Sequence, residues 1–200
     1  MFYRFTFICF ALFSGIAAGF SQNTNLAWQV SENQIFTLHY TAPDSSLVPV
    51  LTETLLRGVA ENSAFFGQPF LRSFDVWCFP DRAALDRQWQ HDWGDTTFQS
   101  SCWMVASGVA HRLDLLSPRV WDTQACEHGS PLVLTGSGAS FRNEKESAAF
   151  RRLITHELTH VWQWQNRART LYSPWRVGAE HRPGVDPYLF DTGSNPRFLD

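Results

Sequence analysis

The sequence has almost no lysine and no excess of positive charge. Lys145 is the only lysine among 16 basic residues, and the formal net charge of the 200-residue chain is −3. Without a basic surplus, a protein has no general electrostatic attraction for nucleic acid or for an anionic membrane surface. We therefore expect neither nucleic acid nor a lipid surface as a partner.

The chain also lacks internal repeats, low-complexity tracts and a recognisable linker between domains. Its length suits a single domain. Hydrophobic residues make up 44% of the sequence, including nine Trp and 17 Phe, which is enough for a buried core and excludes a disordered or collagen-like chain. Composition thus indicates one globular domain, and the chemistry has to come from motifs.

Long apolar stretches are absent beyond the N-terminus. There, Arg4 precedes an apolar run over residues 5–16, and the small residues Ala17 and Gly19 fit a cleavage site. The run is shorter than the roughly 20 residues that span a bilayer. The pattern predicts a signal peptide over residues 1–19 and a mature domain over residues 20–200. This domain would be secreted or periplasmic and would keep no stable membrane anchor.

No cysteine has a C-x-x-C neighbour, so the sequence gives no support for a cysteine-based zinc site or redox motif. Three cysteines follow the signal peptide, which in an oxidising compartment suggests one disulfide and one buried thiol. Cys78 lies in an apolar, strand-like run and suits the buried thiol. Cys102 and Cys126 flank the central segment, and we favour them as the pair.

Strand and helix patterns alternate along the mature chain, which indicates an α+β or α/β class. The segment 21–34 is polar and reads as a lead-in, and 117–140 reads as loop-rich with a possible short strand at 131–135. The expected regular elements are strands at 35–40 and 74–79, helices at 47–66 and 82–91, a hairpin or two adjacent strands within 102–116, and a helix beginning after Asn143.

The last of these helices contains the pentapeptide His156-Glu157-Leu158-Thr159-His160. Two histidines at i and i+4 lie about 40° apart around a helix, so both imidazoles can bind one metal ion. Glu157 projects beside them, where its carboxylate can take a proton from water. This is the H-E-x-x-H arrangement of zinc peptidases, and it predicts His156 and His160 as Zn²⁺ ligands and Glu157 as the general base.

The third metal ligand lies outside the pentapeptide. The metzincin pattern is excluded, because Gln163 and Asn166 stand where it requires Gly and His. Glu180 is the only glutamate after the motif, 20 residues beyond His160, on an expected short helix over residues 174–182. The rival ligands are His181, Asp186 and Asp191. His111 and His128 could also approach the site, although a lone histidine is more often a surface or core residue.

The run HELTHVWQ at residues 156–163 resembles the gluzincin metallopeptidases, especially the peptidase MA-like group of exported bacterial proteins. A more diffuse likeness extends over about residues 35–165. The resemblance implies a small zincin-like α+β domain with its core over about residues 35–182. In that fold a twisted sheet packs on the H-E-x-x-H helix, and a substrate-binding edge strand would come from about residues 103–116. It also implies a peptide or protein substrate, and the spacing of His160 and Glu180 is thermolysin-like.

The sequence departs from this family in one respect. Peptidase MA-like proteins often carry W-x-x-E-G with its Glu on zinc, whereas here Gly178 follows Trp175 where Glu is expected. Glu180 comes two residues later, about 200° around a helix. A non-catalytic or degenerate binding module of the same fold therefore stays open as an alternative. A third hypothesis is an aromatic-rich carbohydrate-binding domain. Glu157 favours the enzyme, because a structural zinc site has no use for a base.

Overall fold

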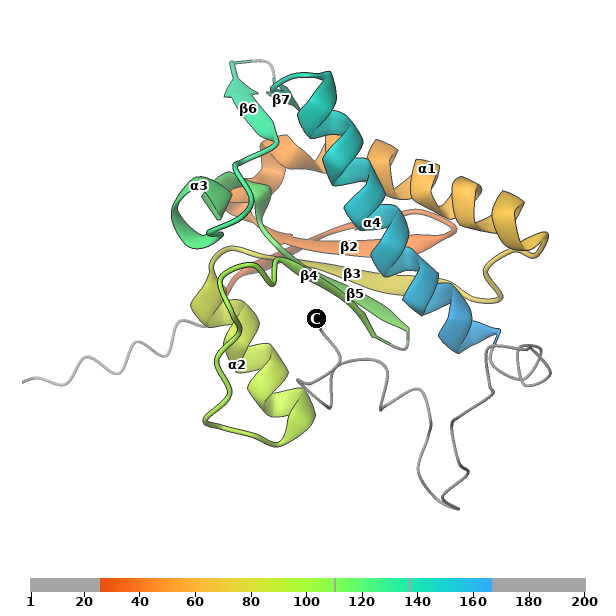
Figure 1. Cartoon of the computed structure of the whole chain (residues 1–200), viewed down its shortest axis with the longest axis horizontal. Helices are drawn as coiled ribbons and strands as arrows, with labels where there is room; N and C mark the ends of the chain where they lie inside the picture. Colours follow the sequence, from red (N-terminus) through yellow and green to blue (C-terminus); the bar gives the residue numbers. More distant parts are fainter. Residues whose placement is uncertain (1–25, 110, 137, 167–200) are drawn as a thin grey trace, which may run out of the picture.

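The computed structural model describes residues 26–109, 111–136 and 138–166, which form an α+β fold (Figure 1). A five-stranded sheet is built from β1 (Trp28–Glu32), β2 (Phe36–Thr41), β3 (Phe74–Phe79), β4 (Ala106–Val109) and β5 (Arg112–Leu116). The helices are α1 (Val48–Phe66), α2 (Arg82–Trp93), α3 (Trp121–Gln124) and α4 (Glu144–Gln165). Two short 3-10 helices, Ala42–Leu47 and Pro118–Val120, precede α1 and α3.

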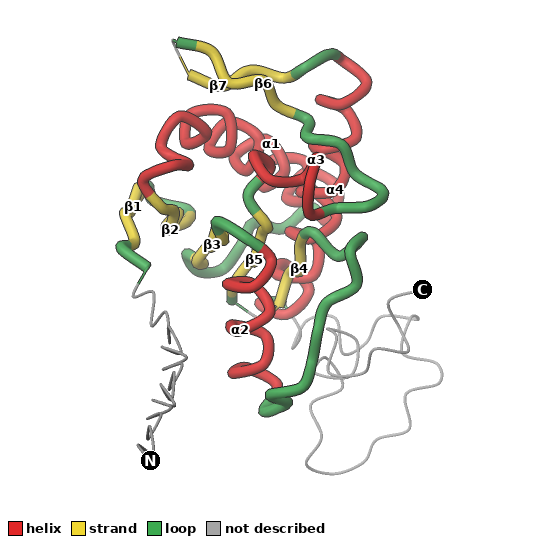
Figure 2. Tube along the Cα trace, turned by 90° about the vertical axis from the view of Figure 1, so that its left-hand side faces the viewer, coloured by secondary structure: helices red, strands yellow, loops and turns green. Residues whose placement is uncertain are grey.

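The strand order in the sheet is β1-β2-β3-β5-β4. The three central strands, β2, β3 and β5, are parallel, while β1 and β4 pair antiparallel at the two edges. A second, two-stranded sheet consists of β6 (Leu132–Thr135) and β7 (Gly138–Phe141), and Figure 2 shows this hairpin set apart from the main sheet. Strand β4 thus has one edge without a neighbouring strand in the described residues.

Helices α1 and α4 cover one face of the sheet and α2 lies on the other (Figure 1). Alternating apolar residues of the central strands point toward α1 and α4, where burial of their side chains stabilises the fold. The residues buried on this side include Phe36, Leu38, Val76, Leu113, Leu115, Leu51, Leu55, Phe150, Ile154 and Leu158. The face under α2 holds Trp89, whose indole N–H donates to buried Asp114 over 2.9 Å.

Local sequence signals set the helix boundaries. The Asp81 side chain accepts a hydrogen bond from the Ala84 N–H at the start of α2, and Asn143 accepts one from the Glu146 N–H at the start of α4. Gly67 ends α1 with φ of 64°, a left-handed conformation that glycine adopts without a steric penalty. The predictions for these three helices are confirmed.

The predicted strands around residues 35–40 and 74–79 are also confirmed, and residues 102–116 contain the antiparallel pair β4 and β5. Two predictions are wrong. The polar lead-in at 21–34 contains β1, whose Trp28 packs against Trp77 and Phe79. The segment 117–140, expected to be loop-rich, contains α3 and most of β7 as well as the expected short strand β6.

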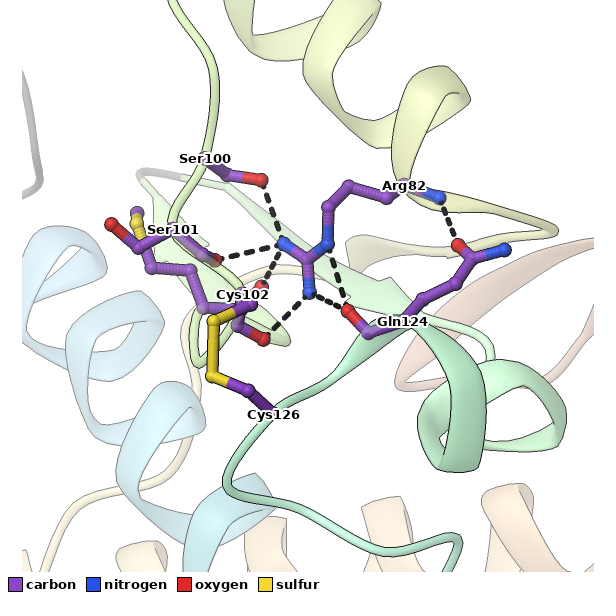
Figure 3. Close-up of a disulfide and its surroundings, with 7 residues drawn as sticks. Arg82, Ser100, Ser101, Cys102, Gln124 and Cys126 are labelled. Atoms are coloured by element: carbon purple, nitrogen blue, oxygen red, sulfur yellow. Dashed lines mark hydrogen bonds between the residues drawn. A yellow bond between two sulfur atoms is a disulfide. The ribbon is translucent and has the colours of Figure 1, made fainter.

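A disulfide joins Cys102 to Cys126, as favoured from the sequence, and Cys78 is a buried thiol. Next to the disulfide, the Arg82 guanidinium donates hydrogen bonds to the carbonyl oxygens of Cys102 and Gln124 at 2.9 and 2.7 Å, and to the Ser100 hydroxyl at 2.7 Å (Figure 3). Arg82 therefore holds together the two segments that the disulfide links covalently.

The expected signal peptide at residues 1–19 lies outside the described residues. Within those that are described, no helix combines the length and the apolar character needed to cross a bilayer.

Candidate functional site

Helix α4 brings His156 and His160 together on one of its faces. Their Nε2 atoms lie 3.3 Å apart, and the two rings are nearly perpendicular, with centroids 4.9 Å apart. Two imidazole nitrogens bound to one tetrahedral zinc ion at about 2.0–2.1 Å would be about 3.3–3.4 Å apart. The spacing and the chemistry of these two donors therefore fit a zinc ion.

Glu157 lies beside this pair and contacts the edge of the sheet. Its Oε2 accepts a hydrogen bond of 2.7 Å from the backbone N–H of Gly108 in β4. The contact is close: a Cβ added to Gly108 would overlap the Glu157 carbonyl oxygen and lie 3.2 Å from the His160 Cβ. The H-E-x-x-H segment and the edge strand therefore form one site, with a half-buried carboxylate between them.

Helix α1 holds α4 from its other side through a buried asparagine. The Asn62 amide N–H donates to the backbone carbonyl oxygens of Gly58 and Thr155, each at 3.0 Å. The Asn62 Oδ1 accepts a hydrogen bond of 2.8 Å from the Thr159 hydroxyl. Thr155 and Thr159 each immediately precede a histidine of the motif, so these bonds fix the turn of α4 that carries both imidazoles.

The C-terminal end of α4 is fixed to the segment after α1. The Gln165 side-chain oxygen accepts hydrogen bonds from the N–H groups of Leu71 and Arg72, and its amide donates to the Arg72 carbonyl. The Trp162 indole stacks on Phe66 with ring centroids 3.9 Å apart. With its middle and its C-terminal end anchored, α4 has a fixed register against the sheet.

A buried Arg–Asp pair lies on the opposite face of the sheet, under α2. Burial raises the pKa of Asp114, while the Arg112 guanidinium, whose Nε lies 2.7 Å from Asp114 Oδ1, and the Trp89 indole N–H oppose that rise. Arg112 also pairs with Asp92 of α2. Because these groups face away from α4, we assign them to the packing of α2 rather than to the site.

The sequence predicts a third metal ligand beside His156 and His160. Glu180, His181, Asp186 and Asp191 all lie outside the described residues. Within residues 26–166, apart from 110 and 137, no group of three or more His, Cys, Asp or Glu side chains is arranged to hold a metal ion.

The two other histidines considered from the sequence have aromatic neighbours. His111, in the turn between β4 and β5, has its ring centroid 6.0 Å from that of Trp164, one helical turn beyond His160. His128 packs near Trp121, with centroids 5.5 Å apart. Neither histidine joins the pair of His156 and His160 in a three-ligand group.

Sequence reasoning missed two residues of this arrangement, Gly108 and Asn62. Gly108 belongs to a run of small residues, Ala106-Ser107-Gly108, which is typical of a close backbone approach but does not say to what. Asn62 interrupts the apolar face of α1 among Leu55, Val59 and neighbouring buried residues. A polar residue on an otherwise apolar helix face was the signal from which the role of Asn62 could have been inferred.

Comparison of the chain with protein-family models, with curated proteins and with solved structures finds no match.

Proposed function

We propose that this chain is an exported zinc-dependent peptidase with a small gluzincin-like domain. The observation that carries the proposal is the 3.3 Å separation of the Nε2 atoms of His156 and His160, with the Glu157 carboxylate next to them at the sheet edge. Two converging imidazoles supply ligands, and the carboxylate supplies a base that no purely structural zinc site requires.

A zinc ion bound by these histidines would polarise the carbonyl of the scissile peptide bond and make a water molecule more acidic. Glu157 would accept a proton from the attacking water as the water oxygen adds to the carbonyl carbon. The carboxyl group then delivers the proton to the amide nitrogen, so that the C–N bond breaks and a free amine leaves. The products are a carboxylic acid and an amine, and one water molecule is consumed.

The proposed third ligand is Glu180. Two neutral imidazoles leave the full +2 charge of zinc unbalanced, so a carboxylate is electrostatically favoured as their partner. Glu180 has the residue type and the spacing from His160 that a glutamate ligand on a following helix would have.

The test is metal analysis and hydrolysis by the purified mature chain. We expect about one zinc per molecule, bound by the parent and by a His128→Ala control, and little in His156→Ala or His160→Ala. Glu157→Gln should keep the metal, because Glu157 is not a ligand, and should lose hydrolysis of an unfolded protein substrate. Thermal unfolding of each variant shows whether it is folded.

Equal zinc in the parent and in both histidine variants would overturn the metal site. Activity that survives in Glu157→Gln would overturn the role of the base. Zinc binding without any hydrolysis would instead favour the non-catalytic binding module of the same fold.

A further inference from the structure

Gly108 in the edge strand β4 contacts the proposed base, and two independent features mark the contact. Its backbone N–H donates to Glu157 Oε2 at 2.7 Å. Its missing side chain leaves room for α4, since an added Cβ would lie 2.8 Å from the Glu157 carbonyl carbon and would overlap the carbonyl oxygen. Contacts of this length do not occur between real Cβ atoms and backbone, so any other residue here would move β4 away from α4.

We propose that Gly108 is a positioning residue for Glu157: its N–H holds one carboxylate oxygen and thereby directs the other toward the reacting water. This inference rests on the proposed function and deepens it. A carboxylate on a helix surface samples several rotamers, and a proton acceptor that is misplaced by about 1 Å can slow a reaction roughly 100-fold. A hydrogen bond from rigid backbone removes that freedom at Oε2 and leaves Oε1 to accept the proton.

The position of β4 at the edge of the sheet explains why a backbone N–H of this strand can bind the Glu157 carboxylate. Gly108 pairs with Leu113 of β5, and the Leu116 N–H donates to the Val105 carbonyl at 2.8 Å. By the alternation of an antiparallel ladder, the Gly108 N–H then points away from β5 toward the outer edge. Strand β5 holds β4 in place, and the Gly108 N–H, which makes no hydrogen bond to β5, donates to the Glu157 carboxylate.

The first experiment compares Gly108→Ala with the parent chain and with Gly129→Ala, the same substitution at an exposed loop glycine, where an added Cβ would meet no atom closer than 3.6 Å. Gly108→Ala should lower kcat roughly 10- to 100-fold while zinc content and KM stay near the parental values. Gly129→Ala should keep the parental kcat. A purely structural role would lower the folded fraction of Gly108→Ala without changing kcat per folded molecule.

A second variant separates the hydrogen bond from the steric effect. Replacing Gly108 with glycolic acid converts its amide to an ester, which removes the N–H and adds no atom that could clash with α4. The ester should show the same fall in kcat and should retain zinc. If Gly108→Ala does not fold, the ester variant alone tests whether the Gly108 N–H positions Glu157.

The outcomes are distinguishable from failure of the proposed function. Parental kcat in the ester, or in folded Gly108→Ala, overturns the positioning role while the peptidase stands. A fall in kcat that comes only with loss of zinc also overturns it. A parent chain that neither binds zinc nor hydrolyses peptide overturns both proposals.

Discussion

At the scale of single residues, the site depends on side chains whose spacing follows from helix geometry. His156 and His160 converge because i and i+4 share a helix face, and their Nε2 separation fits two ligands of one metal ion. Glu157 lies one residue further round the helix and therefore faces the edge strand at Gly108. Two of the three positions share one proposed role, as metal ligands, and Glu157 has another, although all three lie within little more than one turn of α4.

The third ligand is tested by comparing two acidic residues of the C-terminal segment. Glu180→Ala should weaken zinc binding by more than the roughly 10- to 100-fold that loss of an outer-shell partner costs. The reason is that it would remove the carboxylate that we propose balances the charge of the metal. Asp186→Ala, a matched loss of one negative charge, should leave the affinity near the parental value. Competition with a chromogenic zinc chelator measures both, and an equal effect of the two variants would contradict the assignment.

At the scale of elements, the pairing of α1 with α4 supports the site from behind. Asn62 is buried, and its amide joins the backbone of both helices while its oxygen accepts from Thr159. A buried amide whose donors and acceptor all have partners stabilises one arrangement of the helices, because any shift leaves polar groups without partners.

We expect Asn62→Ala to lower the free energy of unfolding by about 2–3 kcal/mol, because it leaves a small cavity and buried polar groups of α4 without this partner. Urea denaturation of the mature chain measures the change. The control is Glu53→Ala, an exposed position of α1, which should change the free energy by less than about 0.5 kcal/mol. A similar small loss in Asn62→Ala would show that apolar packing alone fixes the two helices.

At the scale of the whole molecule, local signals predicted most elements but not how they meet. The sequence predicted the helix ends at Asp81, Asn143 and Gly67, because capping interactions join residues that are only a few positions apart in the chain. Strand β1 was missed because a polar edge strand has few apolar residues to reveal it. The contact of Gly108 with Glu157 depends on the strand order, which places β4 beyond β5, and no local pattern encodes that order.

The Cys102–Cys126 disulfide also acts at the scale of the whole molecule, through its effect on stability. It closes a loop between residues 24 positions apart, and that loop contains β4, β5 and α3. Both cysteines are exposed, so the bond contributes little by burial. Its stabilising effect comes mainly from restricting the unfolded chain, which for a loop of this length amounts to about 3.5 kcal/mol.

The double variant Cys102→Ser/Cys126→Ser should therefore unfold at lower urea concentration than the parent, with a loss of about 2–4 kcal/mol. It should nevertheless keep the native structure around the site, because the Arg82 guanidinium still binds the Cys102 and Gln124 carbonyl oxygens from both sides of the broken link. Reduction of the parent should reproduce the loss, and reductant should not affect the double variant. Equal stability of parent and variant would mean that the denatured chain already brings these segments together. Collapse of the native state would mean that Arg82 cannot hold them without the covalent bond.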